Sequence, residues 1–159
     1  MSELHIYTDG GSSGNPGPGG WAYVILSQAP AGEPVLAAEA SGGEADTTNN
    51  RMELLAVISA LESLEAKKEK SAEKQTISLF TDSQYVQKGI TAWIKAWKQN
   101  GWRTRNREPV KNQDLWQRLD ALAARFPITW QWVRGHAGNA YNERCDALVQ
   151  KAIDTRRRR

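Results

Sequence analysis

The chain has 159 residues, of which 40% are apolar and 25% charged, so we expect one folded domain with a buried core and exclude extended disorder. Its 21 basic and 18 acidic residues give a formal net charge of +3, which alone is weak support for a polyanionic partner. The longest apolar run has six residues, far fewer than the roughly 20 of a membrane-spanning helix, and one cysteine excludes an internal disulfide. Glu3 and His5 interrupt the N-terminus before an apolar signal region can form, so we expect a cytoplasmic protein.

The first quarter of the chain is predicted to form strands. Residues 4–8 are rich in β-favouring side chains, and the run Asp9-Gly10-Gly11 ends this strand. Residues 12–20 are rich in glycine and proline, so we expect a loop there. Residues 21–27 and 35–41 are predicted as the two strands of an antiparallel hairpin with a longer connection.

The rest of the chain alternates helices and strands. Residues 46–50 supply several possible N-caps for a helix whose apolar side chains recur at helical spacing, namely Leu54, Val57, Ile58 and Leu61. A strand is predicted at 76–81, followed by a short helix that ends at Gly89. The remaining predicted elements are a helix at 93–99, a basic loop to Pro109, a helix at 113–125, a strand at 128–133 and a helix at about 142–155. This order predicts an α/β domain with a mixed sheet flanked by helices.

The positive charges are concentrated in two segments. Residues 88–111 hold seven lysines and arginines against the single acid Glu108, and residues 156–159 add four arginines. Three tryptophans are interleaved with the first set of charges, a combination expected of a nucleic-acid-binding surface. The four-residue spacing of Trp93 and Trp97 is equally expected of side chains that face inward from a helix, and both interpretations can hold. For the C-terminal arginines we expect a solvated, disordered tail.

Four carboxylates are predicted at positions from which they can converge on one site. Asp9 and Asp82 each close a predicted strand, and ligands gather beyond the carboxyl ends of neighbouring parallel strands. Glu53 is predicted in the first turn of its helix, and Asp146 near the start of the last helix. Each residue alone is also explained by ordinary turn or helix-terminus chemistry. Together they would repel one another unless divalent cations were bound, and oxygen ligands of this kind suit Mg²⁺ or Mn²⁺ and two-metal phosphodiester hydrolysis.

Two further features bear on catalysis. His136 lies in a glycine-flanked loop after a strand, where an exposed imidazole could carry protons or help a product leave, although a lone histidine is more often structural. Residues 10–14 match the G-x-S-x-G pattern of a serine nucleophile, but this pattern requires a helix immediately after the serine. The prolines and glycines that follow exclude such a helix, so Ser12 is not expected to be a nucleophile.

From about Leu4 to Ile153 the chain resembles the bacterial type 1 ribonuclease H family. The motifs that carry the resemblance are YTDGG with GNPGPGG (7–11 and 14–20), TTNNRMEL (47–54), TDSQYV (81–86), WQWVRGHAG (130–138) and NERCD (142–146). The resemblance implies a ribonuclease H-like fold, in which a five-stranded mixed sheet, an antiparallel hairpin plus parallel strands, has helices on both faces. It implies one catalytic domain over residues 1–155 with a basic protrusion at 88–111, and a basic tail at 156–159.

The resemblance further implies an activity and its residues. The activity is endonucleolytic hydrolysis of the RNA strand of RNA/DNA hybrids, independent of sequence, leaving 5′-phosphate and 3′-hydroxyl ends. By resemblance, Asp9, Glu53, Asp82 and Asp146 hold two Mg²⁺ ions, with Mn²⁺ as a substitute, and His136 assists turnover. Implied minor-groove contacts are Gly10, Asn15, Asn50 and Gln84. Thr48 and Arg51 resemble a pocket for a DNA-strand phosphate, and Trp93, Trp97 and Lys98 resemble the protrusion that grips that strand. We expect a monomer and assign no protein partner.

Two other functions compete with this one. The first is a catalytically silent module that only binds the hybrid, and the presence of all four carboxylates with His136 argues against it. The second is a DNA nuclease or strand-transfer enzyme on the same fold. Asn15, Asn50 and Gln84 argue against the second, because a protein that reads the wide minor groove for 2′-hydroxyls selects RNA.

Overall fold

The computed structural model describes residues 3–28, 32–66, 76–133 and 139–157. The strands are β1 (Glu3–Ser12), β2 (Gly17–Gln28), β3 (Val35–Thr47), β4 (Thr76–Thr81) and β5 (Ile128–Trp132). The helices are α1 (Asn49–Ala66), α2 (Gln84–Lys88), the π-helix η1 (Gly89–Trp93), α3 (Ile94–Gln99), α4 (Gln113–Ala123) and α5 (Ala140–Arg157). Within these described segments, no helix combines the length and the apolar composition needed to cross a membrane.

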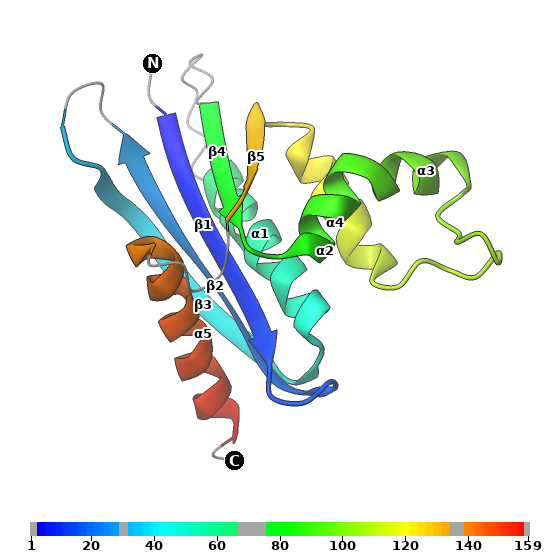
Figure 1. Ribbon diagram of the computed structural model, residues 1–159, viewed down its shortest axis with the longest axis horizontal. Helices are drawn as coiled ribbons and strands as arrows, with labels where there is room; N and C mark the ends of the chain where they lie inside the picture. The colour runs from blue at the N-terminus through cyan, green and yellow to red at the C-terminus, as the bar shows by residue number, and fades with distance from the viewer. Residues whose placement is uncertain (1–2, 29–31, 67–75, 134–138, 158–159) are drawn as a thin grey trace.

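The strands form one five-stranded mixed sheet in the order β3-β2-β1-β4-β5, which confirms the predicted sheet (Figure 1). β2 is antiparallel to both β1 and β3, whereas β4 is parallel to β1 and β5 is parallel to β4. β1 is therefore the central strand, and the carboxyl ends of β1 and β4 lie at the same end of the sheet.

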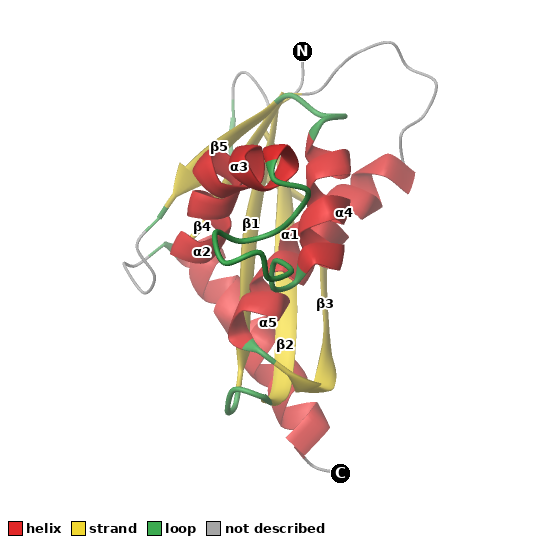
Figure 2. Ribbon diagram, turned by 90° about the vertical axis from the view of Figure 1, so that its right-hand side faces the viewer, coloured by secondary structure: helices red, strands yellow, loops and turns green. Residues whose placement is uncertain are grey.

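Helices cover both faces of the sheet, as predicted. Successive side chains of a strand point to opposite faces, so Ile6 packs with α1 while its neighbour Tyr7 packs with α5. On the α5 face, Cys145 and Val149 are buried against Tyr7 and Val24. α4 packs on α1 rather than on the sheet, and Figure 2 shows α2, α3 and α4 gathered on the same side of the molecule.

The glycine-rich segment is more regular than its composition predicts. β1 continues through Ser12 and β2 begins at Gly17, so the connection is only residues 13–16 and the predicted loop at 12–20 is wrong. Gly11 pairs with Gly20 and Ser12 with Gly19. This backbone is held extended by pairing with neighbouring strands, which local composition does not reveal.

The start of α1 agrees with the prediction, since its cap is among residues 46–50, whereas the end of α5 differs from it. α1 begins at Asn49, where the Arg51 amide N–H donates to Thr48 Oγ1 over 3.2 Å, so Thr48 is the residue that caps it. α5 continues through Arg157, past residue 156, at which the tail was predicted to begin. Arg156 is held in the helix because its guanidinium donates to the Ala152 carbonyl oxygen over 3.2 Å, whereas Arg158 and Arg159 lie outside the described residues.

Gly89 does not end a helix, contrary to the prediction. α2, η1 and α3 follow one another without a break, and Gly89 has right-handed helical angles, φ −61° and ψ −49°. The need for glycine comes instead from Trp116, a fully buried side chain of α4 whose ring lies against the Gly89 backbone. The Trp116 indole N–H also donates to Tyr85 Oη over 2.9 Å, which fixes the ring in this position.

Substituting Gly89 by alanine should therefore destabilise the protein. The new Cβ would lie 2.5 Å from Cζ2 of Trp116 and overlap other atoms of that ring. Because the ring is fully buried, we expect a loss of about 2–3 kcal/mol in the free energy of unfolding, measured by urea denaturation. The exposed neighbour Lys88 is the control, and Lys88→Ala should change that free energy by less than about 0.5 kcal/mol. Equal stabilities of Gly89→Ala and wild type would contradict this packing argument.

Five aromatic side chains form one cluster between α2, η1, α3 and α4. We call it the aromatic cluster, and its members are Tyr85, Trp93, Trp97, Trp102 and Trp116. Neighbouring ring centroids in the cluster lie 5.2 to 6.2 Å apart. Trp93 and Trp97 are half-buried, so the predicted inward packing is confirmed and part of each ring stays accessible.

Candidate active site

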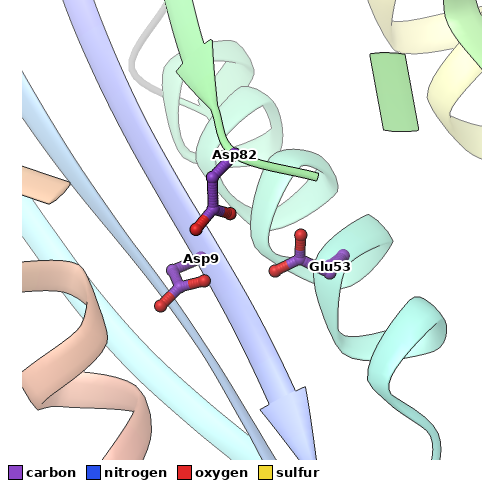
Figure 3. A group of neighbouring side chains, drawn as sticks. All are labelled: Asp9, Glu53 and Asp82. Carbon is purple, nitrogen blue, oxygen red and sulfur yellow. The ribbon is translucent and has the colours of Figure 1, made fainter. Parts of the chain in front are cut away.

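Asp9 and Asp82 are brought together by the parallel pairing of two strands. The register pairs Tyr7 of β1 with Phe80 of β4, and each aspartate lies two residues further along its strand direction. Their carboxyl groups therefore lie near each other, where β4 has ended and β1 continues to Ser12 (Figure 3).

Glu53 reaches the same place from α1. α1 begins at Asn49, so Glu53 lies one turn into the helix rather than in the first turn as predicted, and its side chain is 5% exposed. The backbone of α1 comes so close to β1 that a Cβ on Gly10 would lie 2.5 Å from the Glu53 amide nitrogen. As a result, carboxylate oxygens of Asp9, Glu53 and Asp82 all lie within 4.8 Å of one another (Figure 3). We call these three residues together the carboxylate group.

A pocket of about 240 Å³ opens beside this carboxylate group. Its lining residues are Asp9, Gly10, Gly11, Ser12, Asn49, Asp82, Asn142, Asp146, Val149, Gln150 and Ile153. Asp146 of α5 thus shares the pocket with Asp9 and Asp82, although it is not one of the three residues within 4.8 Å. The fourth predicted carboxylate therefore faces the others across a space open to solvent.

Burial of the carboxylates and repulsion between their negative charges raise the pKa values of Asp9 and Glu53. Burial, together with the charges of Asp82 and Asp146, raises the pKa of Asp9 from 3.8 to about 7. Burial and the charges of Asp9 and Asp82 raise the pKa of Glu53 well above its usual value. Hydrogen bonds from Ser83 and from the Gly10 amide to Glu53 only partly offset this increase.

This group of side chains fits a divalent cation. Among the described residues, Oε1 of Glu53 is buried and has no hydrogen-bond partner, although a buried carboxylate oxygen without one is costly. All three residues offer oxygen ligands, the type that Mg²⁺ and Mn²⁺ prefer. Cations would supply both the missing partner and the missing positive charge.

The residues predicted to contact nucleic acid gather around the start of α1. Asn15, in the turn after β1, accepts the Asn49 amide N–H over 3.0 Å, and Thr48 accepts the Arg51 amide N–H. Asn50 is exposed beside them. These residues therefore adjoin the carboxylate group through Asn49, which lines the pocket.

The other predicted contacts lie on α2 to α3. Gln84 is exposed at the start of α2, two residues after Asp82. Lys98 is exposed on α3 next to the aromatic cluster, and its ammonium group lies 3.2 Å from the Asp120 carboxylate. His136 falls in residues 134–138, outside the described part of the chain.

Sequence reasoning missed three polar residues of the pocket: Asn49, Asn142 and Gln150. Gln150 follows Asp146 by four residues, so helical spacing places both on one face of α5 and would have identified it. Asn142 stands first in the NERCD motif but has no helical-spacing signal; it is 3% exposed, and its backbone N–H donates to Asn139 Oδ1 at the start of α5.

Comparisons with known proteins identify the family. The RNase H family model matches residues 1–154. Ribonuclease H of Ruegeria pomeroyi is 56% identical over 154 residues, covering 96% of this chain and 94% of its own. The crystal structure of LC9-RNase H1 is 31% identical, with a TM-score of 0.84, and covers 98% of this chain and 74% of that one. LC11-RNase H1, solved in complex with an RNA/DNA hybrid, is 27% identical, with a TM-score of 0.71. The match covers 96% of this chain and 98% of that one. Because the match spans every strand and helix that contributes to the carboxylate group, this chain belongs to the RNase H family.

Proposed function

We propose that the protein is an endoribonuclease that hydrolyses the RNA strand of RNA/DNA hybrids, independent of sequence, leaving 5′-phosphate and 3′-hydroxyl ends. The observation that carries the proposal is the group of three carboxylates within 4.8 Å of one another beside an open pocket. Family membership and the hybrid bound by LC11-RNase H1 support the choice of substrate.

Asp9, Glu53, Asp82 and Asp146 would hold two Mg²⁺ ions, with Mn²⁺ as a substitute. When bound, ions of this kind activate a water molecule and stabilise the leaving oxygen of the phosphodiester. The chain holds the four carboxylates in place before substrate arrives. Asp9 lies on β1, Glu53 on α1 and Asp146 on α5, and Asp82 directly follows β4.

The polar residues around the carboxylates would orient the hybrid. Gly10, Asn15, Asn50 and Gln84 read 2′-hydroxyls in the minor groove, which only an RNA-containing duplex presents. Thr48 and Arg51 hold a phosphate of the DNA strand, and Trp93, Trp97 and Lys98 grip that strand further along. His136 carries protons or assists release of the product.

The proposal is tested with one end-labelled RNA of mixed sequence presented in several forms. The RNA is supplied single-stranded, in an RNA/RNA duplex and in an RNA/DNA hybrid, beside an all-DNA duplex, each with Mg²⁺ or EDTA. We expect cutting of the hybrid alone, only with Mg²⁺, at many positions and with 5′-phosphate ends. Binding of the hybrid without cutting would instead indicate a silent binding module, and cutting of the DNA duplex would indicate a DNA nuclease.

Metal affinity should depend on pH because the ligands bind as carboxylates. Asp9, with a pKa of about 7, is largely protonated at pH 6 and must lose its proton when Mg²⁺ binds. The dissociation constant should therefore fall as pH rises, by about tenfold per unit below pH 7, and level off above it. Calorimetry at pH 6 in buffers of different ionisation enthalpy should show release of one or more protons. An affinity that is equal at pH 6 and pH 8 would contradict the raised pKa.

A further inference from the structure

The guanidinium of Arg51 is already paired with two acids of the protein. Its two Nη atoms face the Asp114 carboxylate oxygens at 3.5 and 3.3 Å, and its Nε lies 3.6 Å from Glu44 Oε1. Asp114 comes from α4 and Glu44 from β3, so three elements meet at this guanidinium. One positive charge is therefore flanked by two negative charges at the place where the proposed function puts a DNA-strand phosphate.

Asp114 approaches Arg51 in the same way that a phosphate would. Arginine binds phosphates and carboxylates through two parallel N–H groups, and the two Nη atoms here point to the two oxygens of one carboxylate. A phosphate can make this pair of hydrogen bonds only after the carboxylate has left. We propose, on the basis of the proposed function, that Asp114 is a specificity-determining residue that occupies Arg51 in the free protein and is exchanged for a DNA-strand phosphate in the complex.

The exposure of the pair makes such an exchange feasible. The Arg51 side chain is 32% exposed and that of Asp114 is 67% exposed, and ion pairs this open to water are weak. A phosphate delivered directly to Arg51 thus replaces one weak pair by another charge-assisted pair. Asp114 can then turn into solvent, since it lies at the start of α4 on the surface.

The exchange also discriminates between duplexes. Arg51 is held in place relative to the carboxylate group, because two backbone amides at the start of α1 donate hydrogen bonds to Asn15 and Thr48. A hybrid seated with its minor groove on Asn15 and Asn50 brings one phosphate to Arg51. A duplex of different groove geometry leaves the Arg51–Asp114 pair intact, and the carboxylates of Asp114 and Glu44 then repel its backbone.

The test uses Asp114→Asn, which keeps the shape of the side chain and removes its charge. The KM for a hybrid should fall about two- to fivefold with kcat unchanged. The dissociation constant for an all-DNA duplex of the same sequence, measured by fluorescence anisotropy in EDTA, should fall by a larger factor than that for the hybrid. The preference for hybrid over DNA would therefore decrease, a change that a merely structural role of Asp114 would not produce.

Two controls separate this effect from a general loss of negative charge. Glu62 of α1 pairs with Arg118 of α4 over 2.8 Å, so Glu62→Gln removes an equal charge from the same pair of helices but away from Arg51. Glu62→Gln should leave the affinities for the hybrid and for the all-DNA duplex within about 1.5-fold of wild type. In an Arg51→Ala background no exchange can occur, so Asp114→Asn should tighten binding of the hybrid and of the DNA duplex by the same factor and leave the preference between them unchanged.

The outcomes are distinguishable. Three results would overturn the exchange. They are a higher KM for Asp114→Asn, a decrease in KM no larger than that of Glu62→Gln, and a loss of the preference for hybrid over DNA that persists in the Arg51→Ala background. Urea denaturation of each variant shows whether any change reflects folding instead. A wild-type protein that does not cut the hybrid would overturn the proposed function itself, and this is seen before any variant is made.

Discussion

Replacing Asp9 by asparagine will stop cleavage of the hybrid and make the metal-free protein more stable. Asparagine is nearly the same size but cannot carry the negative charge that a cation requires, so kcat/KM should fall by more than about a hundredfold. Binding of the hybrid in EDTA should be retained and slightly stronger, since the substitution removes a carboxylate that repels phosphates. Cleavage at the wild-type rate would contradict the role of Asp9.

The stability gain has a defined pH dependence. The Asp9 carboxyl has a pKa of 3.8 in the unfolded chain and about 7 in the folded protein, so the folded state prefers the protonated form. The resulting loss of stability is absent below pH 3.8, grows as pH rises toward 7 and is complete above it. In EDTA, Asp9→Asn should therefore match wild type at pH 3.5 and exceed it by at least about 2 kcal/mol at pH 8.

Urea denaturation across this pH range checks the prediction. Asp154→Asn is the control because Asp154 is an exposed acid on α5, and its stability should follow wild type at every pH. A stability difference between Asp9→Asn and wild type that is the same at pH 3.5 and pH 8 would show that charge repulsion is not its cause.

Replacing Gly10 by alanine should cause the second large effect, through the packing of β1 on α1. The added Cβ would lie 2.5 Å from the Glu53 amide nitrogen and overlap the Met52 carbonyl carbon. These are backbone atoms of a helix, and Gly10 itself is in the central strand of the sheet, so neither side can move by rotating a side chain. The overlap can be removed only if α1 shifts away from β1, and this shift moves Glu53 away from Asp9.

We expect cleavage by Gly10→Ala to fall by about a hundredfold, since misplacing a catalytic group by about 1 Å has effects of this size. Unfolding should become easier by about 1–3 kcal/mol. The stability control is Gly11→Ala, whose Cβ would meet only side-chain atoms, Asn49 Oδ1 at 3.3 Å and Val149 Cγ1 at 3.8 Å. If Gly10→Ala kept wild-type stability and activity, close packing of the strand on the helix would not be what positions Glu53.

The convergence of the carboxylates could be predicted from sequence because it depends on topology. Once the strands that lead to Asp9 and Asp82 are identified as parallel neighbours, the two residues can lie side by side. The register of β1 and β4 places them together, although β1 continues past Asp9 to Ser12 instead of ending there as predicted. Glu53 and Asp146 were predicted from their place near helix starts, a weaker argument, and the family resemblance strengthened it. The turn assigned to Glu53 was wrong by one turn because the helix start depends on which of several polar residues caps it.

Features that depend on distant partners could not be predicted. Gly89 resembles a helix terminator by itself, and only the Trp116 ring, brought from α4, explains why glycine is needed inside a helix. Asp114 is 63 residues from Arg51 in the chain, so no local pattern relates them. The roles of His136 and of the nucleic-acid contacts stay predictions that rest on the family resemblance.

The aromatic cluster gives the protein an intrinsic optical probe. It holds Trp93, Trp97, Trp102 and Trp116, so four of the seven indoles of the chain lie within one cluster next to Lys98. At centroid separations of 5.5 to 6.2 Å, excitation passes readily among them, and a base stacked on one accessible ring would dim the emission of the group. Tryptophan fluorescence would therefore report, without any label, whether nucleic acid contacts α3, at a site distinct from the carboxylate group.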